Sequence, residues 1–494
     1  MKYKVKAAAS LTALALILLP GTAALCGERG EGKIRLRVCN WEEYIDLGDW
    51  DEEETIDLES GDIIGVNPLI RDFEEWYKET YGREVEVEYS TFGNNEDLYN
   101  MLTLGDVYDL VCPSEYMIMK LMNEGMLAPL SEDFFDTGNE NNYYINGVSP
   151  YIRRIFDEQE TGGEAWSKYM AGYMWGITGI VYDPAQITQE EASTWKLLAD
   201  PAYKRRVTIK DNVRDSYFAA VGAIKSDLLT DNAFTSAPDY AKRLEEEMND
   251  ISPETLGQVQ EWLKDVKDNA YSFESDAGKA DMITGKVAAN YQWSGDGVYT
   301  LDQADEEDYR LQFTVPQEAT NIYFDGWVML KDGIKNDPDR QQAAEAFINF
   351  LSRPDSVIRN MYYIGYTSCI SGGSDDRIFE YAQWNYDVDE EDADGEELID
   401  YDLGYFFGDG EDYTVTARAG DVHRQLGAAY PSKEDMSRSS IMTYFDEEQN
   451  AVINQMWINV RCISVYDMPA YVWVILFLAA VGLVFLLVRK KKRS

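Results

Sequence analysis

Aromatic side chains stand beside carboxylates at four places where a strand-like run of the sequence ends. These places are residues 40–44 (NWEEY), 113–116 (PSEY), 293–296 (WSGD) and 323–325 (YFD). An aromatic face attracts an organic ammonium by about 0.5 to 2 kcal/mol. A carboxylate adds a charge-assisted hydrogen bond that fixes the position of the amine. The pattern therefore predicts a binding site for an organic cation.

The same residue types leave two other functions open. Rings and carboxylates also bind sugars, and two acids that face each other across a cleft can hydrolyse a glycosidic bond. The chain has a single histidine, His423, and five cysteines without a CxxC spacing. It therefore offers no clustered zinc ligands and only one candidate for a triad base. We therefore expect no metal site and no cofactor, whereas amine binding, sugar binding and glycoside hydrolysis all remain open at this point.

Hydrophobic periodicity predicts the elements that position these residues. Alternating apolar residues predict strands at 34–38, 85–89 and 108–112, and helical spacing predicts helices at 68–81, 96–104, 116–123, 253–267 and 340–351. This alternation favours an α/β fold with parallel strands flanked by helices. In such sheets ligands gather beyond the carboxyl ends of the strands, where the four motifs lie.

The composition excludes some partners. The chain has 90 Asp and Glu against 44 Lys and Arg, a formal net charge of −46. Such a surface repels nucleic acid and anionic lipid and attracts cations. The acidic stretches 42–62 and 387–412 contain no lysine or arginine. We expect 42–62 and 371–420 to be insertions or long surface loops rather than core.

Both ends of the sequence predict export and attachment to a membrane. Three lysines, an apolar run over 7–19 and small residues form the pattern of a signal peptide over 1–25. Residues 470–488 carry no charge and are numerous enough to cross the hydrocarbon layer as one transmembrane helix. The basic tail 489–494 is typical of the cytoplasmic side. We therefore expect a single-pass protein of the cell membrane whose main part lies outside the cytoplasm.

Short motifs in a constant order relate the chain to a known family. Besides 40–44, they are 90–96 (STFGNNE), 108–116 (YDLVCPSEY), 123–126 (NEGM), 175–180 (WGITGI), 211–215 (DNVRD), 321–325 (NIYFD), 347–351 (FINFL) and 364–366 (IGY). Over residues 33–370, and more loosely to 461, the chain resembles the periplasmic spermidine/putrescine-binding receptors of polyamine ABC importers. Members of this family bind and deliver ligands and have no enzymatic chemistry.

The resemblance implies a role for each matching residue. The residues that would line the ligand are Trp41, Tyr44, Ser114, Tyr116, Asp215, Ser275, Trp293, Tyr323, Asp325 and Tyr366. Trp293 and Tyr323 would stack on the methylene chain of the polyamine. Asp325 would hold a terminal ammonium.

Three further residues are weaker candidates. The family commonly has a carboxylate for the inner amine where this chain has Asn212. The loss of that anion predicts a site tuned toward putrescine or an unusual amine rather than spermidine. Glu42 and Glu115 would either restore the charge or face solvent.

The implied fold is the two-lobe type II periplasmic-binding-protein fold, with a hinge of two crossing strands near 178–182 and 324. The implied bounds are 33–180 and 325–374 for lobe 1, and 181–324 and 375–465 for lobe 2. A ligand in the cleft would close the lobes, and the closed form would dock on permease subunits served by a cytoplasmic ATPase. A receptor for another small solute such as a sugar, and a tethered ligand sensor, are the alternatives.

Overall fold

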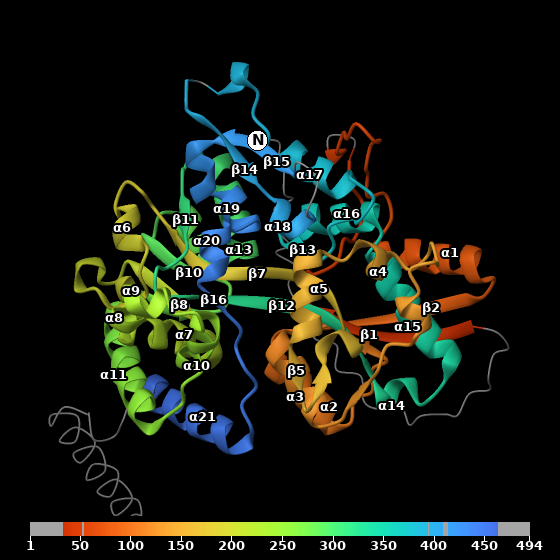
Figure 1. Ribbon diagram of the computed structural model, residues 1–494, viewed down its shortest axis with the longest axis horizontal. Helices are drawn as coiled ribbons and strands as arrows, with labels where there is room; N and C mark the ends of the chain where they lie inside the picture. The colour runs from red at the N-terminus through yellow and green to blue at the C-terminus, as the bar shows by residue number, and fades with distance from the viewer. Residues whose placement is uncertain (1–32, 52–53, 394, 409–412, 463–494) are drawn as a thin grey trace, which may run out of the picture.

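The computed structural model describes residues 33–51, 54–393, 395–408 and 413–462. Within these residues a twelve-stranded mixed sheet forms the centre of the molecule (Figure 1). The main path of neighbouring strands is β2 (Glu84–Phe92), β1 (Lys33–Trp41), β3 (Leu110–Val111), β12 (Thr320–Leu330), β7 (Met170–Tyr182), β10 (Ala289–Trp293), β8 (Val207–Lys210) and β9 (Ser272–Glu274). Short strands off this path are β4 (Leu127–Ala128), β11 (Gln312–Thr314), β13 (Thr367–Ser368) and β16 (Ser439–Ser440).

Two long strands connect the two halves of this sheet. β7 and β12 run antiparallel to each other and are buried along their whole length. At one side of this pair β3, β1 and β2 are mutually parallel, and at the other side β10, β8 and β9 are mutually parallel. Figure 1 shows β7 and β12 as the extended ribbons that cross the middle of the molecule.

Helices cover both halves of the sheet. The longer ones are α1 (Leu69–Tyr81), α2 (Asn95–Leu104), α3 (Glu115–Asn123), α5 (Pro150–Glu158), α7 (Val213–Ile224), α10 (Tyr240–Met248), α11 (Pro253–Asn269), α13 (Ser294–Glu306), α15 (Pro338–Leu351), α16 (Pro354–Ile364), α17 (Arg377–Tyr386) and α21 (Glu447–Arg461). In α1 the buried residues Leu69, Phe73 and Tyr77 recur every four positions, so one face packs on the core. Phe73 meets Phe347 of α15 edge-on, with ring centroids 5.0 Å apart.

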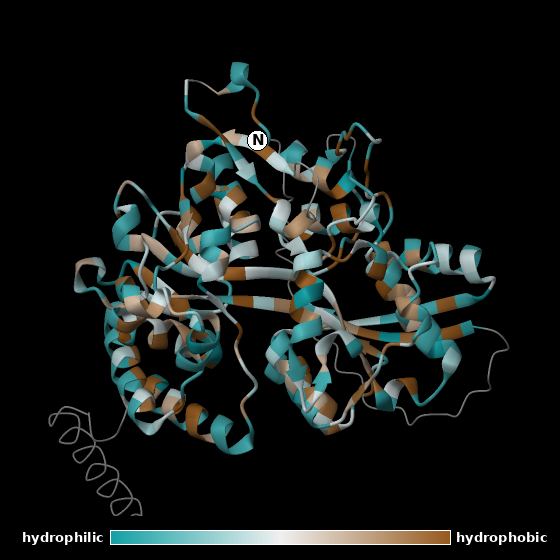
Figure 2. Ribbon diagram, viewed as in Figure 1, coloured by the Kyte–Doolittle hydropathy of each residue, from teal (hydrophilic) through white to brown (hydrophobic). Residues whose placement is uncertain are grey.

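The apolar side chains form two cores. The larger core surrounds β1, β3 and α15, and the smaller one surrounds β8, α7 and α11. β7 contributes Ile177 to the larger core and Ile180 to the smaller one. Figure 2 shows the same distribution, with hydrophobic segments along the central strands and hydrophilic segments on the outer helices. The larger core also includes Val298 and Leu301 of α13 and Phe313 of β11, so it extends from the β1 side of the sheet across β7 to the other side.

Several elements predicted from the sequence are confirmed. The helices expected at 68–81 and 340–351 are α1 and α15, with bounds that differ by at most two residues. The strand expected at 34–38 is the core of the longer β1. These segments were predictable because their hydrophobic period matches their burial pattern.

The prediction that residues 371–420 form surface loops is wrong. This stretch contains α17, the antiparallel pair β14 (Leu398–Asp402) and β15 (Thr414–Arg418), and α18 (Gly404–Phe407). Phe406 is inaccessible to solvent and stacks on Trp175 of β7, with ring centroids 5.5 Å apart. Because this stretch is rich in acids, its average composition is hydrophilic. The aromatic residues between the acids nevertheless supply enough apolar surface to form core.

The acidic segment 42–62 has little regular structure, but it is anchored from within. Ile45 and Ile56 are buried in the larger core, which contradicts the expectation that this segment is only a surface loop. The buried carboxylate of Asp46 accepts a hydrogen bond from Arg359 Nε at 2.7 Å. Arg359 Nη1 also donates to Asp72 of α1 at 2.7 Å. A buried ion pair therefore fixes this segment to α16 and α1.

No helix among the described residues is both long enough and apolar enough to cross a membrane. The predicted signal peptide 1–25, the predicted transmembrane helix 470–488 and the basic tail 489–494 all lie outside the described residues.

Replacing Asp46 with asparagine tests the buried ion pair. The change removes the more deeply buried of the two carboxylates paired with the Arg359 guanidinium, so we expect a loss of up to about 3 to 5 kcal/mol in the free energy of unfolding. Urea denaturation followed by tryptophan fluorescence measures this loss. The matched control is Asp339→Asn, which breaks an exposed 2.9 Å contact with Arg83 and should cost under about 1 kcal/mol. Equal losses in the two variants would contradict the anchoring role of Asp46.

Candidate ligand-binding site

Asp325 is a buried carboxylate that only neutral groups contact. It lies in β12, where the pairing with β7 shifts register, and is 6% exposed. The Tyr44 hydroxyl donates to Oδ2 at 2.8 Å and the Ser114 hydroxyl donates to Oδ1 at 2.8 Å. Burial raises the pKa of Asp325 to about 6, against the effect of the two hydroxyl donors. Asp325 is therefore ionised at neutral pH, and among the described residues it has no cationic partner within ion-pair distance.

Tyrosine rings surround this carboxylate. The ring centroid of Tyr44 lies 5.3 Å from that of Tyr366 and 5.7 Å from that of Tyr173, in edge-on arrangements. Tyr323 and Tyr366 are 6.3 Å apart. The Tyr366 ring packs directly on Gly295. Only a glycine permits this contact, because a Cβ atom at position 295 would lie 2.1 Å from the ring. The rings form an aromatic enclosure around Asp325.

Ser114 is the N-cap residue of α3, and Tyr116 lies in the first turn of that helix. The side chain of Asn95, in the first turn of α2, donates to Ser114 Oγ at 3.1 Å and to Tyr116 Oη at 3.0 Å. Asn95 thereby holds both hydroxyl groups in place. Sequence reasoning quoted Asn95 only as part of a motif and did not predict this role.

Glu115 is buried close to Asp325 rather than exposed to solvent. It is 1% exposed, and one of its oxygens accepts a hydrogen bond from the Phe324 N–H at 3.1 Å. Burial raises the pKa of Glu115 to about 8, and the charge of Asp325 acts in the same direction. Glu115 is therefore mainly protonated at neutral pH and does not supply the negative charge that the sequence left open for it.

A second carboxylate, Asp215, lies in the first turn of α7. It is 6% exposed and accepts a hydrogen bond from Trp293 Nε1 at 3.3 Å. Burial raises the pKa of Asp215 to about 6, and the charge of Lys210 opposes this rise. Asn212 caps α7, because its side-chain oxygen accepts the backbone N–H of Arg214 at 2.7 Å. An amide at this position therefore has a structural role in shaping the helix end that carries Asp215.

Asp296 connects the two carboxylate clusters. Its Oδ1 accepts the Tyr366 hydroxyl at 3.2 Å, and its Oδ2 lies 3.9 Å from Lys210 Nζ. Lys210 Nζ in turn lies 4.2 Å from the centroid of the Trp293 ring and donates to the backbone oxygen of Ser275 at 3.3 Å. Asp296, in the first turn of α13, is the carboxylate of the 293–296 motif but was not among the residues predicted to line the ligand. Lys210, at the end of β8, belonged to neither set.

Two predicted residues lie apart from these contacts. Trp41, at the end of β1, packs on Phe92 at the end of β2, with ring centroids 4.7 Å apart. Glu42 is exposed. Within the described part of the chain, neither side chain shares a hydrogen bond or ring contact with Asp325 or Asp215.

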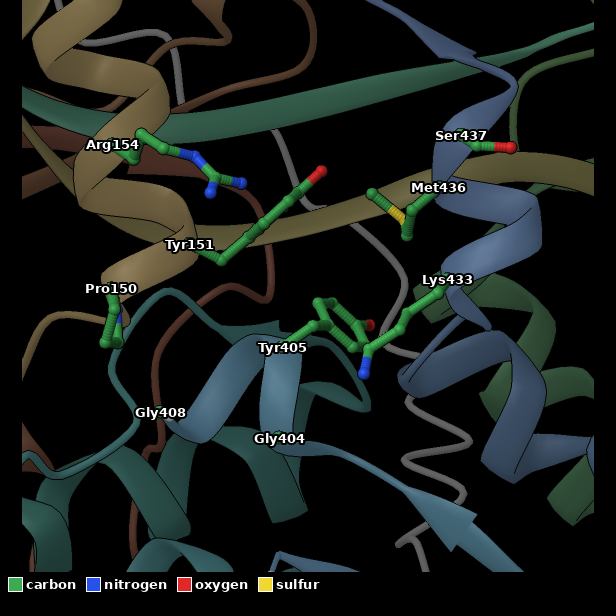
Figure 3. A pocket seen from close by; sticks show the side chains of 9 residues that line it. All are labelled: Pro150, Tyr151, Arg154, Gly404, Tyr405, Gly408, Lys433, Met436 and Ser437. Carbon is green, nitrogen blue, oxygen red and sulfur yellow. The ribbon is translucent and has the colours of Figure 1, made fainter. Parts of the chain in front are cut away.

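A cavity of about 420 Å³ opens elsewhere on the molecule. It is lined by Pro150, Tyr151, Arg154, Gly404, Tyr405, Gly408, Lys433, Met436 and Ser437. Figure 3 shows Tyr151 of α5 and Met436 of α20 (Lys433–Ser437) pointing into it from opposite sides. Its lining contains two basic side chains and no carboxylate, so it is chemically unsuited to an amine and does not coincide with the predicted site.

Comparison with known proteins places the chain in a family. The model of the bacterial extracellular solute-binding proteins matches residues 69–381, which is more than half of the sequence. The chain belongs to this family. The family is defined by binding rather than by catalysis, which supports the expectation that this solute-binding protein is not an enzyme.

Several curated relatives share about a quarter of their residues with this solute-binding protein. The spermidine/putrescine-binding periplasmic protein of Salmonella typhimurium is 26% identical, over 59% of this chain and 72% of that protein. The putrescine/agmatine-binding protein of Pseudomonas aeruginosa is 25% identical, over 58% of this chain and 72% of that protein.

Solved structures show the fold. The spermidine/putrescine ABC transporter substrate-binding protein of Streptococcus pneumoniae superposes with a TM-score of 0.55 and 21% identity, covering 87% of this chain and 98% of the other. The Tp0655 lipoprotein of Treponema pallidum gives 0.56 and 19%, covering 86% and 99%. The architecture is therefore the periplasmic solute-binding protein fold with a mixed α/β sheet.

The raised pKa of Glu115 predicts a pH-dependent stability. Because its folded-state pKa of about 8 exceeds the ordinary value of 4.5, the stability it contributes is lost as pH rises between these values. The wild type should therefore lose stability relative to Glu115→Gln between about pH 5 and 8, as measured by urea denaturation at each pH. Asp325 and Asp215 are present in both proteins, so their titration largely cancels. A stability difference that does not change with pH would refute the assignment.

Proposed function

We propose that the protein is an extracytoplasmic polyamine receptor that delivers its ligand to an ABC importer. The observation that carries this proposal is the environment of Asp325. An ionised, buried carboxylate that accepts hydrogen bonds only from hydroxyl groups lacks a counter-charge, and an ammonium would supply that charge. The surrounding tyrosine rings offer the faces that an ammonium and its methylene chain prefer. A neutral sugar would leave the charge of Asp325 without a counter-ion.

A second anion makes a ligand with several amines a better fit than a single ammonium. Asp215 lies beside Trp293 and, like Asp325, is buried and about half-way through its titration near pH 6. Its cluster and that of Asp325 are linked through Asp296 and Tyr366. A chain with an amine at each end could reach both acids and cover the rings between them. The names of the relatives, which specify spermidine, putrescine and agmatine, support this ligand class.

In this proposal Asp325 holds one terminal ammonium, and Tyr44 and Ser114 orient the carboxylate. Trp293 and Tyr323 stack on the methylene chain, with Tyr366 beside them. The remaining members of the proposed site are Trp41, Tyr116, Asp215 and Ser275.

Ligand capture is proposed to close two lobes, which the sequence assigns to 33–180 with 325–374 and to 181–324 with 375–465. β7 contributes to both cores and β12 runs antiparallel beside it, so these two strands would serve as the hinge. The closed form would then present a surface to the permease subunits, which work with a cytoplasmic ATPase.

The receptor is further proposed to be exported by the signal peptide 1–25 and tethered by a transmembrane helix at 470–488, with 489–494 in the cytoplasm. This part rests on the sequence, because the uncharged run is long enough for a bilayer and is followed by basic residues. A tether would keep the receptor at the outer face of the membrane, close to its importer.

Replacing Asp325 with asparagine tests the ligand class. The change removes the buried charge and preserves the shape, so we expect putrescine and spermidine to bind about 100-fold more weakly, as measured by isothermal titration calorimetry. The control is Asp332→Asn, an exposed acid just after the same strand, which should leave the affinity unchanged. Failure of the wild-type protein to bind any alkyl amine would reject the proposed function, and unchanged affinity in the Asp325 variant would reject the proposed site.

A membrane fractionation tests the tether. The full chain should stay in the pellet after an alkaline carbonate wash, because a spanning helix resists extraction. A variant that ends after residue 462 should move to the soluble fraction. Both are made with Cys26→Ala, which removes the lipid attachment that a cysteine near a signal peptide could provide. Release of the full chain by the wash would exclude the transmembrane helix.

A further inference from the structure

A lysine of the chain itself occupies a cation position among the proposed ligand contacts. Lys210 ends β8, and its side chain has no solvent exposure. Its Nζ lies 4.2 Å from the centroid of the Trp293 ring, 3.6 Å from Glu274 and 3.9 Å from Asp296, and it donates to the Ser275 backbone oxygen at 3.3 Å. An aromatic face with nearby carboxylates is the environment that an organic ammonium prefers.

The acids around Lys210 are already occupied by groups of the protein. Glu274 Oε1 accepts Asn290 Nδ2 at 3.0 Å and Glu274 Oε2 accepts the Gly278 N–H at 2.8 Å. Asp296 Oδ1 accepts the Tyr366 hydroxyl and also lies 3.4 Å from Lys279 Nζ. With Lys210 added, these two carboxylates have internal partners on every oxygen. They are poorly available to an ammonium of a ligand.

Two buried acids of the proposed site remain without a cationic contact. In the part of the chain that the structure describes, neither Asp325 nor Asp215 forms an ion pair within 4.0 Å. Asp325 receives two hydroxyl groups, and Asp215 receives the indole N–H of Trp293. Among the described residues these two anions have no ion-pair partner, whereas Lys210 and Lys279 both contact Asp296, and the buried Arg214 guanidinium lies 5.0 Å from the centroid of the Tyr116 ring.

Resting on the proposed function, we propose that the Lys210 ammonium substitutes for one amine of the ligand, so that the cleft selects diamines over triamines. Two ammonium groups neutralise Asp325 and Asp215. A third would have to lie near Lys210, where like charges repel and the nearby carboxylates are already paired. Lys210 is then a specificity-determining residue that sets the number of amines rather than the strength of binding at Asp325.

Lys210 affects ligand selection in a different way from Asn212. The amide at 212 removes a negative charge from the site, whereas Lys210 adds a positive one that is buried and held in place by four contacts. Both features favour diamines over triamines. Only the effect of Lys210 can be tested by removing a positive charge from the protein and measuring whether a ligand amine takes its place.

The test compares the dissociation constants of putrescine and spermidine in the detergent-solubilised full chain by isothermal titration calorimetry. The wild type should bind putrescine at least tenfold more tightly than spermidine. In Lys210→Met the ratio of the spermidine constant to the putrescine constant should fall at least tenfold, because a spermidine amine can then take the vacated place. Lys210→Gln, which keeps a donor for the Ser275 oxygen, is the second variant and should shift the ratio in the same direction.

Lys225→Met is the matched control. Lys225 is also largely buried and contacts two acids, Glu247 at 2.7 Å and Asp250 at 2.8 Å, but it lies at the far end of α7 from Asp215. Its loss should lower stability without changing the ratio of the two constants by more than twofold.

The outcomes separate this inference from the proposed function. Amine binding with an unchanged ratio in both Lys210 variants, or a wild type that prefers spermidine, would overturn the role of Lys210 and leave the polyamine receptor intact. A wild type that prefers spermidine overturns the role of Lys210 even if neither Lys210 variant folds. A wild type that binds no diamine or triamine would overturn both proposals.

Discussion

The structure around the site depends on one unbalanced charge, the carboxylate of Asp325. A buried anion without a counter-ion is costly, and hydrogen bonds from hydroxyl groups recover only part of that cost. The protein holds Tyr44 and Ser114 against Asp325 from two different strand ends, and Asn95 fixes Ser114 in turn. Such convergence of separate elements on one carboxylate is explained if a cation completes the arrangement. Without a ligand, the same contacts would stabilise the fold less than an apolar core of equal volume.

The position of Asp325 within the fold matters as much as its charge. It lies in β12, which pairs along its length with β7, the strand that contributes to both apolar cores. Asp325 contacts Ser114 at the edge of the larger core, whereas Asp215 and Trp293 belong to the end of the sheet that packs on the smaller core. A ligand held by both acids would bridge the two cores. Recognition and lobe closure would then be the same event, because each acid gains its counter-charge only when both halves approach the ligand.

The sequence predicted the frame and many of the site residues, and the reasons are physical. α1 and β1 have apolar periods that match their burial. Ser114 and Trp293 lie at carboxyl ends of strands, where the rule expects ligand contacts, whereas Asp325 lies in the middle of β12. Burial of polar groups was not predictable in the same way. The sequence gives no sign that Lys210 is fully enclosed, because a lysine at the end of a strand is ordinarily exposed. The same limit applies to Glu115, whose protonation depends on burial that only the packing of α3 against β12 creates.

The contrast between the surface and the site explains how so acidic a chain can still be selective. A net charge of −46 attracts every cation over a distance of about 8 to 10 Å at physiological salt, so it raises the rate of encounter without distinguishing one amine from another. Discrimination must come from buried groups, where screening is weak and each charge requires a partner. There, among the described residues, two acids, Asp325 and Asp215, have no ion-pair partner, and Lys210 is the lysine that lies over the Trp293 ring of the site. An additional surface acid increases the attraction of all amines alike. A single buried lysine, in contrast, changes how many ligand amines the buried acids can neutralise. Selectivity is therefore independent of the overall charge.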